Sequence, residues 1–72
     1  MGNYKIYETE HEGIKLRIEE SFPEVGAYLY VFKGKKCIKD FLQNNISVCK
    51  KFALEKYGVP INQWLEIVNP EV

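Results

Sequence analysis

The chain has 72 residues, of which 46% are hydrophobic and 28% charged, and its ten basic and ten acidic side chains leave a formal net charge of zero. This length predicts one small domain over residues 1–72, burying only about 60% of its unfolded surface, and the balanced charge argues against non-specific DNA binding. The sequence shows neither a secretory signal nor an apolar stretch long enough to span a bilayer, so we expect a cytoplasmic protein with no membrane partner.

The first part of the chain predicts two strands, a turn and a loop. Residues 4–9 carry strand-forming side chains, and residues 14–19 alternate strictly between apolar and charged side chains, as a half-buried strand does. Residues 10–13 form the predicted turn between them, because Gly13 can adopt a positive φ. Residues 21–26 are predicted as a loop, since Pro23 has no N–H to donate to a strand ladder.

The third predicted strand, residues 27–33, is the most informative segment of the sequence. Small aliphatic side chains occupy one of its faces, and Tyr28, Tyr30 and Phe32 occupy the other. A half-buried strand normally carries polar side chains on its second face. The aromatic face is therefore either covered by a second layer or presented to a binding partner.

A fourth strand follows a hairpin tip at residues 34–36. It spans residues 37–42, with Ile38 and Leu42 on the expected core side. Strict alternation also places Asp40 on the inward side, where two explanations stay open. Asp40 either lies at a sheet edge and accepts hydrogen bonds from the following loop, or it is a buried acid with a functional purpose.

The second part of the chain predicts one helix and a short turn. A helical stripe of apolar residues comprises Ile46, Cys49, Phe52, Ala53 and Tyr57. Asn44 or Asn45 is the expected N-cap, and Gly58 followed by Pro60 ends the helix. Residues 61–64 predict a turn that places Trp64 against the open end of the core.

Together these elements predict an α+β fold: an antiparallel β-meander of three to four strands followed by one helix packed on one face. The expected inward side chains of the sheet are Ile6, Ile14, Leu16, Ile18, Ala27, Leu29, Val31, Ile38 and Leu42. The expected outward side chains are Tyr7, Tyr28, Tyr30, Phe32 and Phe41, with Lys5, Lys15, Arg17 and Lys39 between them. Because one helix covers one face only, the aromatic face stays open in the monomer.

The open aromatic face favours a non-enzymatic interaction module that forms a homodimer. Large exposed apolar patches usually mark interfaces, so the aromatic side chains would be anchors and Lys15, Arg17 and Lys39 would form the rim. The charge distribution suits self-association or an oppositely charged protein, because residues 1–24 hold six acids and three bases whereas residues 33–56 hold seven bases and two acids.

Single-stranded nucleic acid is an alternative ligand for the same face. Its bases would stack on the aromatic rings while Lys15, Arg17 and Lys39 contact phosphates. The usual recognition-motif fold needs two helices and a glycine–aromatic signature, and this sequence predicts neither. The zero net charge also disfavours this alternative.

A family resemblance supports another kind of protein partner. From Gly26 the run G-A-Y-L-Y-V, followed by C-I-K-D-F-L-Q-N-N-I-S-V-C-K-K-F-A, resembles HicB-type antitoxin domains over about half of the chain. In that family a strand with paired aromatics, a short strand and a D-T-x-E-E-A-like helix start follow in this order. Residues 34–36 stand where the family has a proline-glycine-cysteine stretch, and residues 44–47 replace the acidic helix start. The resemblance implies an antitoxin-like or immunity-like role, and it transfers no functional residue.

The sequence offers few residues for catalysis or metal binding. His11 is the only histidine, and we expect it to be exposed in an acidic turn. We expect Cys37 and Cys49 to be free thiols packed in the interior, since free cysteine is among the most buried residue types, and a disulfide between them is the alternative. Without paired carboxylates, a nucleophile elbow or a glycine-rich cofactor motif, we expect neither enzyme activity nor a cofactor. An active site formed between subunits stays the enzymatic alternative.

Overall fold

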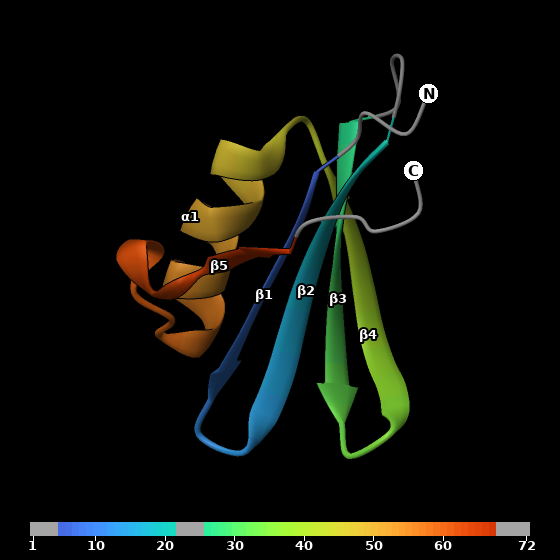
Figure 1. The fold of residues 1–72 in the computed structure, drawn as a ribbon, viewed down its shortest axis with the longest axis vertical. Coiled ribbons are helices and arrows are strands. Elements are labelled where there is room, and N and C mark those ends of the chain that lie inside the picture. The colour runs from blue at the N-terminus through green and yellow to red at the C-terminus, as the bar shows by residue number, and fades with distance from the viewer. Residues whose placement is uncertain (1–4, 22–25, 68–72) are drawn as a thin grey trace.

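A computed structural model describes residues 5–21 and 26–67 as one five-stranded antiparallel sheet with a single helix packed against it (Figure 1). The elements in chain order are β1 (Ile6–His11), β2 (Ile14–Ser21), β3 (Gly26–Lys33), β4 (Lys36–Gln43), α1 (Ile46–Tyr57), the short 3-10 helix η1 (Ile61–Gln63) and β5 (Leu65–Ile67). The spatial order of the strands is β4-β3-β2-β1-β5. The predicted α+β fold is confirmed, with five strands rather than three to four. Most of the predicted loop around Pro23, and Tyr4 of the first predicted strand, lie outside the described residues.

Two tight turns join β1 to β2 and β3 to β4. Glu12 and Gly13 connect β1 to β2 with φ values of 52° and 86°. Two successive positive φ angles match the right-handed twist of the flanking strands, which is why such turns dominate two-residue hairpins. Gly34 opens the turn from β3 to β4 with a φ of 64°. The turn predicted at residues 10–13 is thus shorter than expected, because β1 continues to His11.

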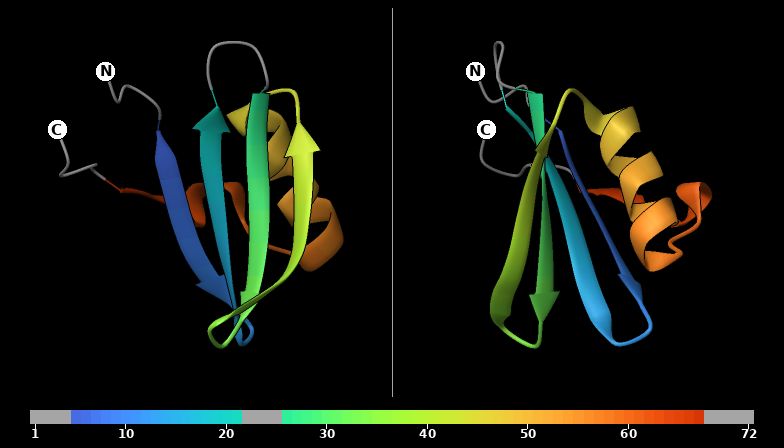
Figure 2. Two further views of the ribbon diagram at one scale, coloured as in Figure 1. Left: turned by 90° about the vertical axis from the view of Figure 1, so that its right-hand side faces the viewer. Right: turned by 180° about the vertical axis from the view of Figure 1, so that it is seen from behind.

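Helix α1 begins and ends at the predicted residues. The Asn45 Oδ1 accepts a hydrogen bond from the Val48 N–H at 2.9 Å, which satisfies one free donor at the helix start. Gly58 adopts a left-handed φ of 77° and donates its N–H to the Leu54 carbonyl at 3.0 Å. In Figure 2, α1 and η1 lie on the same face of the sheet.

The fifth strand returns the chain to the edge of the sheet beside β1. Ile67 pairs with Ile6, and Leu65 pairs with Glu8. The side-chain amide of Gln63 donates to the Thr9 Oγ1 and to the Glu10 carbonyl, both at 2.8 Å, and so holds η1 against β1. Trp64 is only 8% exposed, as its predicted position requires.

The core lies between the sheet and α1. Its members, buried from solvent, are Leu16, Ile18, Ala27, Leu29, Val31, Cys49, Ala53, Val59 and Trp64. The strand residues in this set were all predicted to point inward. Cys49 donates its thiol hydrogen to the Ala27 carbonyl at 3.6 Å, and burial raises the pKa of this thiol to about 11.

The predicted orientation of β1 is wrong. Tyr7 lies opposite Ile18 and therefore shares the helix-covered face, whereas Ile6 lies opposite Glu19 on the other face. The Lys50 Nζ lies 4.3 Å from the centroid of the Tyr7 ring, so this aromatic side chain packs beneath α1. The aliphatic Ile6 misled the prediction, because the larger Tyr7 ring fills the space below the helix instead.

The predicted orientation of β4 is also wrong. Phe41 lies opposite Leu29 on the helix-covered face, and its ring centroid is 4.7 Å from that of Phe52. Ile38 and Leu42, expected in the core, are 45% and 51% exposed. A register shift between the pairs of Val31 and Phe32 leaves Ile38 as an extra residue, and such a bulge breaks the alternation from which the faces were predicted.

Candidate functional site

The open face is the face of the sheet opposite α1, and its side chains lie in three rows across the strands. The first row comprises Leu42, Tyr28, Glu19, Ile6 and Ile67. The middle row comprises Asp40, Tyr30, Arg17, Glu8 and Leu65. The third row comprises Cys37, Phe32, Lys15 and Glu10. The described helices leave all three rows uncovered (Figure 2).

Aromatic side chains run along β3 in the open face. The rings of Tyr28 and Tyr30 are stacked, with centroids 5.9 Å apart and an interplanar angle of 18°. Burial, reinforced by the nearby carboxylate of Glu19, raises the pKa of the Tyr30 hydroxyl. Leu42 widens this apolar strip on the neighbouring strand.

A strip of paired charges lies beside the aromatic strip. The Glu8 carboxylate forms ion pairs with the Lys15 Nζ at 3.6 Å and with the Arg17 Nε at 3.1 Å. The Arg17 guanidinium also lies 3.5 Å from the Glu19 carboxylate. The Arg17 Nε is buried yet has no well-aligned acceptor among the described residues, so its contact with Glu8 is electrostatic rather than a directed hydrogen bond. Partly exposed pairs of this kind each contribute about 0.2–1 kcal/mol.

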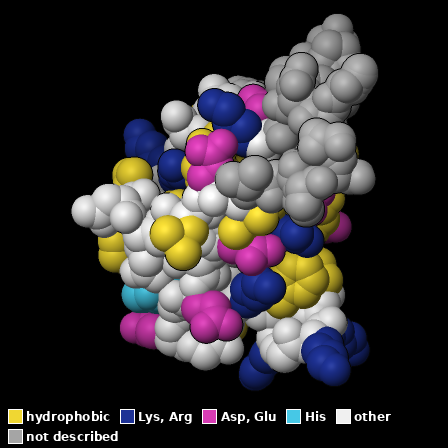
Figure 3. All heavy atoms as spheres, viewed as in Figure 1, with side chains coloured by type: hydrophobic (Ala, Val, Ile, Leu, Met, Phe, Trp, Pro, Cys, Tyr) yellow, Lys and Arg dark blue, Asp and Glu magenta, His cyan; other side chains and the backbone are white. Residues whose placement is uncertain are grey.

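An aliphatic strip lies at the β5 edge of the open face. Leu65 is 69% exposed, and together with Ile67, Glu8, Thr9, Glu10 and Lys15 it lines a shallow recess of about 360 Å³. Figure 3 shows hydrophobic side chains interspersed with charges of both signs on the side of the molecule that carries β5. This strip was missed from the sequence because β5 itself was missed, although the alternation of Leu65, Glu66 and Ile67 after Trp64 could have indicated it.

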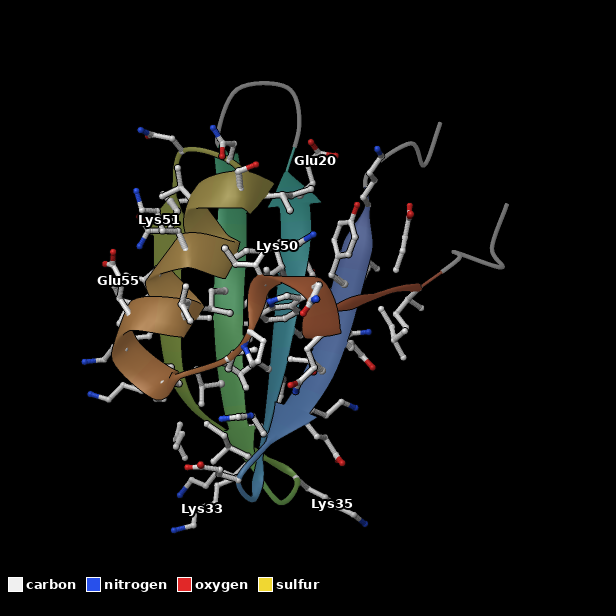
Figure 4. All side chains as sticks on the ribbon, turned by 90° about the vertical axis from the view of Figure 1, so that its left-hand side faces the viewer. Glu20, Lys33, Lys35, Lys50, Lys51 and Glu55 are labelled. Carbon is white, nitrogen blue, oxygen red and sulfur yellow. The ribbon has the colours of Figure 1, made fainter. Side chains whose placement is uncertain are left out.

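A second recess lies where the aromatic strip meets the β3–β4 hairpin tip. It has a volume of about 300 Å³ and is lined by Glu8, Lys15, Arg17, Phe32, Gly34 and Lys35. Figure 4 places Lys33 and Lys35 at the hairpin tip, at the end of the sheet. This recess combines cations with an aromatic ring, which is the chemistry that the nucleic-acid alternative requires.

The structure brings together five of the eight residues predicted for the interaction surface. Tyr28, Tyr30, Phe32, Lys15 and Arg17 share the open face. The other three predicted residues lie on the opposite face: Tyr7 and Phe41 pack against the core, and Lys39 lies opposite Val31. Four other apolar residues take their place on the open face. Ile6 and Leu42 were expected in the core, and Leu65 and Ile67 were not assigned to a surface.

The structure corrects the predictions for His11 and Cys37 and decides between the two explanations for Asp40. His11 is half-buried rather than exposed, with its Nε2 3.7 Å from a Glu12 carboxylate oxygen, because it is the last residue of β1, opposite Ile14, and its side chain lies near Gly58. Cys37 is an exposed free thiol, since the bulge in β4 turns it to the open face opposite Phe32. Asp40 lies on the edge strand β4, as the first of its two explanations requires, but it is exposed on the open face opposite Tyr30 rather than directed inward, because β4 has the reversed phase.

Neither metal clusters nor relatives point to an activity. Within residues 5–21 and 26–67, no three His, Cys, Asp or Glu side chains gather closely enough to hold a metal ion. In the same part of the chain, no helix has the length and apolar character needed to cross a membrane.

The chain matches no family model, no curated protein and no solved structure. The open face is thus the feature of the described residues on which a function can be argued.

Proposed function

We propose that the chain is a non-enzymatic interaction module that forms a homodimer through the open face. The observation that supports this is an uncovered sheet face with a stacked pair of tyrosines and with Leu42 and Leu65 more than half exposed. Monomeric proteins rarely leave large contiguous apolar patches in water, and such patches mark interaction sites. Aromatic side chains dominate the energetics of interfaces, so Tyr28 and Tyr30 are the expected anchors.

A second copy of the chain is the occupant that suits this face. A two-fold interface brings a patch against itself, so the patch must contain groups that complement one another. The open face holds both apolar strips and both signs of charge, with Lys15 and Arg17 beside Glu8 and Glu19. Dimerisation would also add burial to a domain whose small size limits its own core.

The free edge of β4 is a less suitable surface for self-association. Unpaired strand edges invite pairing, and proteins block them with lysines and bulges. Lys36, Lys39 and the bulge at Ile38 provide both devices along β4. The edge is therefore protected, whereas the open face carries no comparable block.

Single-stranded nucleic acid is the competing ligand, and the recess beside Phe32 is the observation in its favour. Lys15, Arg17 and Lys35 line this recess. However, Glu8 already pairs with both Lys15 and Arg17, so only part of this positive charge is free for phosphate groups. Binding dominated by phosphate contacts needs uncompensated cations, and the protein partner is therefore favoured.

Tyr30→Glu tests the proposal, because it places a charge at the centre of the open face without entering the core. Leu54→Glu on α1 is the matched control, since Leu54 is exposed on the other side of the molecule. Light scattering after gel filtration should give a dimeric mass for the natural chain and for Leu54→Glu, and a monomeric mass for Tyr30→Glu with an unchanged circular dichroism spectrum.

Three other outcomes of this experiment would count against the homodimer. A Tyr30→Glu variant that unfolds would show that the aromatic strip is structural. A monomeric natural chain would contradict the homodimer and favour a partner of different sequence, as the antitoxin-like interpretation requires. An absorbance ratio that reveals co-purified nucleic acid, released by high salt, would favour the nucleic-acid alternative.

A further inference from the structure

We infer that the β3–β4 hairpin carries a second interaction surface, which binds an acidic segment of another protein. This surface, called the basic patch, comprises Lys33, Lys36 and Lys39. It lies on the side of the sheet opposite the open face, so the inference goes beyond the proposed homodimer and does not depend on it.

Strand pairing places the three lysines of the basic patch on one side of the sheet. Lys39 lies opposite Val31, and Lys36 lies opposite Lys33. Val31 is buried beneath α1, and Lys33 follows it by two residues in β3, so both share the helix-covered side. All three lysines are nevertheless exposed, and in Figure 1 the hairpin extends past the end of α1.

The positive charge of the hairpin is not neutralised by the described residues. Residues 33–56 hold seven bases and only two acids, Asp40 and Glu55. Among the described residues, every ion pair that a lysine or arginine forms belongs to Lys15 or Arg17 on β2. The cations of the basic patch therefore stay available to a partner, whereas those of the open face are already paired with carboxylates.

The arrangement of the lysines is unfavourable for the chain alone. Lys33 and Lys36 lie directly opposite each other on neighbouring strands, and like charges in such a pair destabilise a sheet. Figure 3 shows basic side chains gathered at the end of the molecule that carries this hairpin. An anionic group placed over the pair would remove the repulsion, so the same charges that destabilise the free chain favour an acidic partner.

Protection of the sheet edge does not by itself explain the basic patch. Lysines on an edge strand prevent unwanted pairing, and Lys36 and Lys39 on β4 serve that purpose. Lys33 lies on β3, which has a neighbouring strand on each side and no free edge. Lys35 adds another cation at the hairpin tip (Figure 4). The cations therefore extend past the edge that they would protect.

The surroundings of the basic patch favour an acidic polypeptide over nucleic acid. The nearest aromatic side chain on that side of β4 is Phe41, whose ring packs against Phe52, so bases would find no free ring on which to stack. Nucleic acid also carries charge along its whole length. At the same end of the sheet it would meet Glu10 and Glu12 at the β1–β2 turn, which a short acidic segment avoids.

Substitution of the three lysines tests the inference. The probe is a capped oligoglutamate peptide with a fluorescent label, followed by anisotropy at low ionic strength, where exposed charges are least screened. Lys33→Gln with Lys36→Gln and Lys39→Gln should raise its dissociation constant at least about tenfold, because three attractive contacts are lost. Lys33→Arg with Lys36→Arg and Lys39→Arg keeps the charge and should leave the constant within about threefold of the natural value.

A matched pair of single substitutions keeps the test decisive if the triple glutamine variant aggregates through its unprotected edge. Lys33→Gln leaves the lysines of β4 in place. Lys5→Gln is its control, because Lys5 is also exposed and the substitution removes the same charge outside the patch. Lys33→Gln should weaken binding of the peptide about threefold, and Lys5→Gln should leave it unchanged. Equal effects of the two substitutions would overturn the inference.

An oligothymidylate of equal charge tests the class of partner. It should bind more weakly than oligoglutamate, and equal or tighter binding would overturn the inference in favour of nucleic acid. The absence of binding to either probe at low ionic strength would overturn it as well. Tyr30→Glu, in the open face, should bind oligoglutamate to within about threefold of the natural chain. A natural chain that proves monomeric would thus contradict the homodimer and leave this inference in place.

Discussion

The two faces of the sheet differ in how completely their apolar side chains are buried. On the covered face, Leu16, Leu29 and Val31 are fully buried beneath α1, where the small side chains of Cys49 and Ala53 let the helix approach closely. On the open face, larger aromatic side chains alternate with ion pairs and stay half-buried. The covered face therefore supplies the stability of the monomer, and the open face holds apolar surface that the monomer does not use.

The largest expected effect comes from truncating one leucine on each face of the sheet to alanine. Leu29→Ala, on the covered face, should lower the free energy of unfolding by about 2–5 kcal/mol because it leaves a cavity in the core. Leu42→Ala, on the open face, should cost the monomer less than about 1 kcal/mol, since its side chain is already half exposed. Urea unfolding of the Tyr30→Glu background measures both in the monomer. Equal costs for the two leucines would mean that the faces do not differ as described.

The buried thiol of Cys49, on the covered face, makes the free energy of unfolding depend on pH. Burial raises the pKa of Cys49 to about 11 from 9.0, so the unfolded chain loses this proton first as the pH rises. The contribution of Cys49 to stability is therefore complete below pH 9 and should fall by about 2–3 kcal/mol between pH 9 and 11. Unfolding of the natural chain compared with Cys49→Ala across this window isolates the effect.

Thiol labelling provides the control for this pH effect. Cys37 is exposed and should react with a disulfide reagent at once, whereas Cys49 should react only as the chain opens. Two fast thiols at neutral pH would contradict the burial of Cys49. A Cys49→Ala variant with the same pH slope as the natural chain would contradict the pKa shift.

A smaller effect is expected where the aliphatic strip joins the sheet. Gln63→Ala removes two hydrogen bonds to β1 and should lower the free energy of unfolding by about 1–2 kcal/mol. Asn62→Ala is the control, because Asn62 is exposed and its side chain makes no hydrogen bond to another described residue. Amide hydrogen exchange should become faster at Leu65 and Ile67 in Gln63→Ala but not in Asn62→Ala. Unchanged exchange in both variants would show that β5 does not depend on this contact.

The sequence predicted the central strands and the helix of the covered face well because their pattern is unambiguous. Leu16 and Ile18 alternate with charged residues, and Asn45 and Gly58 carry the chemistry of helix ends, so local rules identify both β2 and α1. Trp64 was placed correctly for a similar reason, since a large apolar side chain after a helix stop finds the core.

The edges of the sheet were predicted poorly, for physical reasons. In β1 and β4 both faces carry apolar residues, so alternation alone does not say whether Ile6 or Tyr7, or Phe41 or Leu42, meets the helix. The contacts of Tyr7 with Lys50 and of Phe41 with Phe52 decide which side chain faces the helix, and both partners belong to α1 rather than to the strands themselves. The bulge at Ile38 depends on pairing with β3, and β5 offers only the three-residue alternation of Leu65, Glu66 and Ile67 as a signal. Three of the eight residues predicted for the open face, namely Tyr7, Phe41 and Lys39, lie on the other face because they belong to these two strands.

The molar mass of the natural chain across a wide dilution series, measured by sedimentation equilibrium, tests the central claim most directly. The open face as a self-association surface predicts a mass of twice the 8.4 kDa chain at high concentration, falling toward one chain on dilution. A mass of one chain at every concentration would contradict it, and would leave the aromatic strip of Tyr28 and Tyr30 for a partner of different chemistry.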